Sequence, residues 1–109
     1  MVKNPERAFE SLARGFLSEH PEVRHGWRQV KSRWAGDRVD LVCGGGPANE
    51  VFASLMAGQI AVGLTGGAHQ DFEDFGRGRS DEEVAREAFD YFVKLLRQHG
   101  YLERTSTSG

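Results

Sequence analysis

The chain has 109 residues, of which 39% are hydrophobic and 28% charged, and its formal net charge is −2 at pH 7. This composition is typical of a small globular domain and excludes a wholly disordered chain, while the mild negative charge disfavours nucleic-acid binding. No run is apolar enough to enter a membrane or serve as a leader, so we expect a cytoplasmic protein with one domain over residues 1–104 and a disordered tail over 105–109.

The first predicted element is a helix over residues 4–19. Asn4 can act as its N-cap, and Pro5 then takes the first helical position, where its missing N–H leaves no bond unmade. Pro21 disfavours helical geometry at the residue before it, which ends the element. One apolar face follows the helical period: Phe9, Leu12, Ala13, Phe16 and Leu17.

Two β-rich runs follow, at residues 27–34 and 38–44. The first run is ambiguous, because Trp27, Val30 and Trp34 fit a helical spacing while Val30 and Trp34 also fit the alternation of a strand. Glycine-containing stretches on both sides favour the strand. The second run alternates clearly and predicts a strand with one apolar face.

A second predicted hairpin joins residues 50–56 to residues 59–65 through Ala57 and Gly58. The apolar positions of the two runs would face one another on one side of the sheet. The other side carries the small residues Ala61, Gly63 and Thr65. A sheet face of small residues either meets water or admits something closely packed.

The last predicted element is a helix that begins after Ser80 and ends before Gly100. The stretch Ser80-Asp81-Glu82-Glu83 matches a capping box, and a glycine just beyond the last turn is a common helix end. The order of elements predicts an α+β fold with two layers. We expect a three- or four-stranded antiparallel meander, with the N-terminal and C-terminal helices on one face.

The segment between the last predicted strand and this helix is the most acidic part of the chain. Residues 1–38 carry eight Lys or Arg against five Asp or Glu, whereas residues 69–83 carry six acids against two arginines. Phe72 and Phe75 are expected to point inward and anchor the segment. Capping accounts for the acids that begin the helix, but not for Asp71, Glu73 and Asp74, which a partner rich in Lys or Arg would neutralise.

Catalytic chemistry has one candidate pair, because His69 and Asp71 point the same way in an extended chain and a carboxylate can orient an imidazole. No serine or cysteine motif accompanies the pair. The four histidines do not form a metal-binding pattern, and "DFEDFG" lacks the spacing of a calcium loop. The glycine run at 44–46 lacks the lysine of a phosphate loop. We expect no catalytic residue, metal or cofactor.

The hairpin "EVFASLMAGQIAVGL" followed by "AHQDFEDFGRGRSDEEVAREAFDYFVKLLRQHGY" resembles small bacterial immunity proteins of polymorphic toxin systems, over residues 50–101. The resemblance implies a cytoplasmic domain that binds and blocks one cognate toxin and is acidic where it meets a basic active site. His69, Asp71, Glu73, Asp74 and Arg77 would then be the partner-binding residues. The net charge of −2 is milder than that of many nuclease inhibitors, which leaves the chemistry of the toxin open.

Three functions follow as hypotheses. The first is a non-enzymatic protein-binding module that neutralises a toxin, or another protein with a basic surface, through the acidic segment. The second is a small enzyme or ligand-binding domain that uses His69 and Asp71. The third is a structural subunit of a larger assembly.

Overall fold

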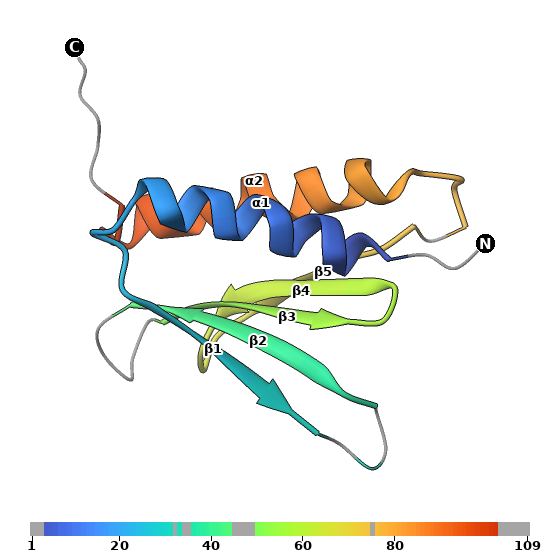
Figure 1. The fold of residues 1–109 in the computed structure, drawn as a ribbon, viewed down its shortest axis with the longest axis horizontal. Helices are drawn as coiled ribbons and strands as arrows, with labels where there is room; N and C mark the ends of the chain where they lie inside the picture. The colour runs from blue at the N-terminus through green and yellow to red at the C-terminus, as the bar shows by residue number, and fades with distance from the viewer. Residues whose placement is uncertain (1–3, 32, 34–35, 45–49, 75, 103–109) are drawn as a thin grey trace.

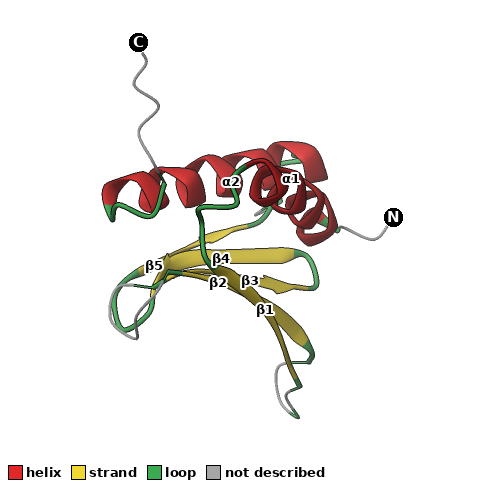
Figure 2. Cartoon of the chain, turned by 60° about the vertical axis from the view of Figure 1, so that its left-hand side comes forward, coloured by secondary structure: helices red, strands yellow, loops and turns green. Residues whose placement is uncertain are grey.

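A computed structural model describes residues 4–31, 33, 36–44, 50–74 and 76–102. Two helices lie side by side over one face of an antiparallel sheet, and among the described residues none forms a helix on the other face (Figures 1 and 2). The elements in chain order are α1 (Pro5–Glu19), β1 (His25–Val30), β2 (Arg38–Cys43), β3 (Val51–Met56), β4 (Gln59–Leu64), β5 (His69–Phe72) and α2 (Asp81–Gln98). The predicted two-layer α+β meander is therefore confirmed.

The strand count and the bounds of the first strand differ from the prediction. Within the described residues the sheet has five strands in the order β1-β2-β3-β4-β5, and the additional strand is β5, which was expected to be part of a loop. The ambiguous run at 27–34 does form a strand, but that strand begins at His25 and ends at Val30. Trp34, Phe75 and the predicted tail 105–109 lie outside the described residues.

Strand pairing follows the alternation of apolar residues. Ala53 pairs with Val62 and Leu55 with Ile60, so both predicted faces of this hairpin are confirmed. The turn between the strands uses Gly58 in a left-handed conformation, with φ at 77°. The carboxylate of Glu6 accepts a hydrogen bond from the Gly58 amide at 3.0 Å, which joins the first turn of α1 to this hairpin.

The core lies between the helices and the inner face of the sheet. Phe9 of α1 contacts Phe92 of α2 edge to face, with 5.7 Å between ring centres, and both rings are fully buried. Phe72 is also buried and closes the core at the β5 edge, as predicted. At the opposite edge, β1 projects beyond the helices (Figure 1), and Trp27 is partly covered by the Arg14 guanidinium, 4.3 Å above its ring.

Both predicted helix starts are at the expected residues, but they are held differently. Ser80 and Glu83 form the complete capping box, with each side chain bonded to the backbone amide of the other residue. Asn4 occupies the N-cap position of α1, yet its side chain makes no capping bond. Its backbone amide instead donates to the carboxylate of Asp81 at 3.1 Å, which links the beginnings of the two helices.

Candidate functional site

The helix-free face of the sheet carries a groove of about 450 Å³. Side chains on this face alternate with the core residues of each strand, so they play no part in packing the helices. Ala61 and Ser54 are the smallest side chains that line the groove, and they leave the depression between larger neighbours. The other lining residues come from four strands: Arg38, Phe52, Met56, Gln59, His69 and Asp71.

Small residues on β4 create this groove. Ala61 points away from the helices, yet only 6% of its surface is exposed, because larger side chains on β3 and β5 rise on either side of it. At Gly63 the strands approach so closely that an added Cβ would lie 2.6 Å from the Cα of His69. The small-residue face predicted for this strand thus lies under the groove and admits the close approach of β5.

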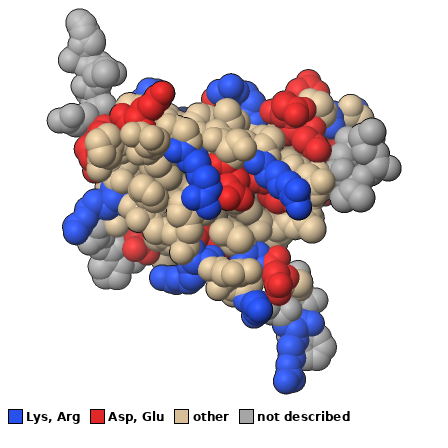
Figure 3. All heavy atoms as spheres, viewed as in Figure 1, with Lys and Arg blue, Asp and Glu red and all other residues tan. Residues whose placement is uncertain are grey.

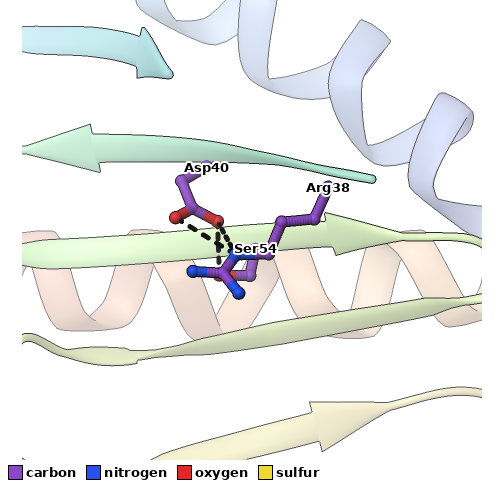
Figure 4. A network of polar contacts seen from close by, with 3 residues as sticks. All are labelled: Arg38, Asp40 and Ser54. Atoms are coloured by element: carbon purple, nitrogen blue, oxygen red, sulfur yellow. Dashed lines mark hydrogen bonds and ion pairs between the residues drawn. The ribbon is translucent and has the colours of Figure 1, made fainter. Parts of the chain in front are cut away.

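A polar network lies on the β2 side of the groove (Figure 4). The Ser54 hydroxyl donates to Asp40 Oδ1 at 2.7 Å, and Arg38 Nε donates to the two carboxylate oxygens of Asp40 at 3.1 and 3.4 Å. The Asp40 side chain is only 15% exposed, whereas that of Arg38 is 40% exposed. The network therefore neutralises the Arg38 charge within the sheet and holds its guanidinium at the groove.

A histidine–aspartate pair lies on the β5 side of the groove. His69 Nε2 is 3.5 Å from Asp71 Oδ1, and their side chains are 53% and 45% exposed. The expected extended geometry, with both side chains on one face, is confirmed because both residues belong to β5. The pair can orient an imidazole at the groove, and it also presents a carboxylate to anything that enters.

Two further acids of the 69–83 segment, Asp74 and Asp81, are bonded within the fold instead of joining this pair. Asp74 turns back on its own chain, since its Oδ1 accepts a hydrogen bond from the Arg79 amide at 2.5 Å. Asp81 is bonded to the start of α1, on the helical layer of the molecule. Glu73 is partly buried and Arg77 is exposed, both in the connection from β5 to α2. Asp74 thus has a contact within its own loop, and the partner-binding role expected of it stays a prediction.

Charge is segregated between the two edges of the sheet. Residues 24–33, which include β1, carry four basic and no acidic residues, whereas residues 69–74, which include β5, carry three acidic and no basic residues. Lys and Arg side chains recur along the lower part of Figure 3, where β1 and β2 project from the body. The sheet therefore runs from a basic edge at β1 to an acidic edge at β5.

The chain matches no protein-family model, and comparisons with curated proteins and with solved structures found no match either.

Within the described part of the chain, no group of three or more His, Cys, Asp or Glu side chains could hold a metal ion. Neither helix of this part is long and apolar enough to span a membrane. Cys43 is buried on the core side of β2, and burial raises the pKa of its thiol to about 12, which disfavours a nucleophilic role.

Sequence reasoning selected His69 and Asp71 but missed the β2 and β3 residues of the groove. The missed residues include Arg38 and Ser54 of the groove and Asp40, which is bonded to both. Asp40 lies opposite Ser54 only when β2 and β3 pair in register. A signal was present, because the polar positions of the 38–44 and 50–56 runs alternate with their apolar positions. Extending that alternation across the predicted hairpins would have placed Arg38, Asp40 and Ser54 on the same face of the sheet as Ala61.

Proposed function

We propose that this protein is a non-enzymatic binding module of the immunity type, which neutralises a cognate bacterial toxin by covering a basic cleft with the helix-free face of its sheet. The observation that carries this proposal is the groove on that face, where the polar side chains of His69 and Asp71 are about half exposed and serve no packing role. Exposed polar groups around a concave, partly apolar surface are typical of recognition sites.

The arrangement of charge supports a protein partner. A basic cleft would face the β5 edge, where Asp71 and Glu73 lie, and acidic groups at its rim would face the arginines of the β1 edge. Complementary charge of this kind accelerates association and selects the partner. The acidic segment thus contributes through Asp71 and Glu73, whereas Asp74 and Asp81 stabilise the fold.

The test begins by purifying the full chain from its source cell together with any protein bound to it. The product of the adjacent gene is tested directly as a candidate partner. The captured protein supports the proposal only if it is toxic when expressed alone and harmless when this chain is expressed with it. The decisive variant is Asp71→Lys, which reverses a half-exposed charge at the groove. We expect it to abolish protection.

Asp90→Lys is the matched control, because it makes the same change of charge at an exposed position on α2, in the helical layer. We expect it to protect as well as the wild type does. Equal protection by Asp71→Lys and the wild type, with both proteins folded, would refute binding through this face. Loss of protection in both variants would point to net charge instead of the groove.

A second function has one observation in its favour. A groove of about 450 Å³ next to the His69–Asp71 pair is within the size range of small-molecule sites. In that case the protein would be a ligand-binding domain or small enzyme in which Asp71 orients the imidazole of His69. Native mass spectrometry of the protein purified from its source cell would reveal a retained small molecule, and His69→Ala would release it.

A further inference from the structure

We propose that the groove over β4 receives one Lys or Arg side chain of the protein partner, whose charged end binds the carboxylate of Asp71. This inference rests on the proposed function, because it names the group of the partner that enters the groove. It follows from the charge balance of the groove and from the chemistry of its walls.

The charge balance of the groove favours a cation. Arg38 is the basic residue that lines it, and Asp40 already neutralises that charge through hydrogen bonds to Arg38 Nε. In a formal count Arg38 and Asp40 cancel, and the carboxylate of Asp71, which lies 3.5 Å from the imidazole of His69, is left over. A net negative charge therefore remains at the β5 side, and a guest carboxylate would meet repulsion there.

The walls of the groove suit a side chain with an apolar stem and a charged end. Phe52 and Met56 of β3 supply apolar surface, and Ala61 leaves room between them and β5. Lys and Arg side chains lay their methylene stems along apolar surface while their charged ends stay near water. Asp71 fits this geometry, because its side chain is 45% exposed at the open side of the groove.

The experiment uses the full-length ¹⁵N-labelled protein and blocked amino acids as probes. N-acetyl-lysine methylamide and N-acetyl-arginine methylamide are titrated in turn, with N-acetyl-norleucine methylamide as the uncharged match and N-acetyl-glutamate methylamide as the anion. We expect the basic probes to shift the amide signals of Ala61, His69 and Asp71 saturably. The norleucine probe should bind about three to five times more weakly, the effect of losing one exposed ion pair.

Two variants make the assignment specific. Asp71→Asn removes the charge and keeps the shape, so it should weaken both basic probes to the level of the norleucine probe. Ala61→Leu should fill the groove and weaken all four probes, and the ¹⁵N spectrum reports whether it still folds. Asp90→Asn on α2 is the control and should bind the basic probes as the wild type does.

The inference is overturned if the basic probes leave these signals unmoved, if Asp71→Asn binds them with unchanged affinity, or if the glutamate probe binds as tightly as they do. The last result would identify an anion site at Arg38. If no basic probe binds but Asp71→Lys still abolishes protection, the proposed function stands and only this inference fails. If the basic probes bind but Asp71→Lys protects normally, the proposed function fails and the groove is a cation site without that role.

Discussion

Asp74 Oδ1 accepts a hydrogen bond from the backbone amide of Arg79, five residues further along the chain. This bond closes the connection between β5 and α2 and sets the path by which the chain reaches the helix cap at Ser80. An acid that the sequence marks as a partner-binding residue thus has a structural role.

Asp74→Ala should therefore lower the free energy of unfolding by about 1.5–3 kcal/mol, the usual cost of losing a hydrogen bond to a charged group. Urea denaturation measures this loss. Glu73→Ala is the neighbouring control and should change stability by less than about 0.5 kcal/mol. Equal stability of the two variants would show that the Asp74 bond contributes nothing to folding.

Replacing Gly63 is predicted to destabilise the pairing of β4 with β5. A Cβ at this position would lie 2.6 Å from both the Ala68 carbonyl oxygen and the Cα of His69, so Gly63→Ala must push the two strands apart. We expect a loss of about 1–3 kcal/mol, as for other overpacked sites, together with faster amide exchange in β5. Gly26→Ala on β1 is the control, because nothing lies within 4 Å of its added Cβ. Unchanged amide exchange in Gly63→Ala would contradict the prediction.

The capping box of α2 predicts a pH dependence of stability. Ser80→Ala should cost about 1 kcal/mol at neutral pH, which thermal or urea unfolding measures. The hydrogen bond from the Ser80 backbone amide lowers the pKa of Glu83 below its ordinary value of 4.5. At a pH above 4.5 the ionised Glu83 carboxylate therefore adds to the free energy of unfolding. This contribution is lost as the pH falls through the lowered pKa.

Glu83→Gln isolates this contribution from the hydroxyl of Ser80. The difference in stability between the wild type and Glu83→Gln should be constant from neutral pH down to about 5, and it should shrink in more acidic solution. A difference that grows on acidification would have the wrong sign and would exclude the cap as its source.

Cys43, the single cysteine of the chain, should be unreactive in the native protein. Its side chain is fully buried, and burial raises the pKa of the thiol to about 12, so almost no thiolate exists even at pH 9. Mass spectrometry after iodoacetamide treatment should find the native chain unmodified and the urea-unfolded chain fully alkylated. Rapid alkylation without urea would show that β2 opens locally.

Local signals explain how much of the architecture the sequence predicts. Pro5, the Ser80–Glu83 box and Gly100 mark helix ends through contacts within a few residues, and the φ of Gly100 is 76° as a helix end requires. The alternation in residues 50–64 determines which side chains face the helices, because neighbouring residues of a strand point to opposite sides. The two layers, the hairpins and the burial of Phe72 could all be inferred in this way.

The candidate site is built from segments that are far apart in the sequence, and only the tertiary structure shows which of them lie together. β5 has four residues, of which only Phe72 is buried, so its sequence carries almost no alternation and its pairing depends on the space left by Gly63 of β4. The groove exists because four strands pair in one register, which places Arg38 on the same face as Asp71. Asp71, Asp74 and Asp81 are all acids of one charged stretch, so the sequence does not distinguish their roles. Folding brings a backbone donor to Asp74 and to Asp81, and these hydrogen bonds give the two residues a structural role.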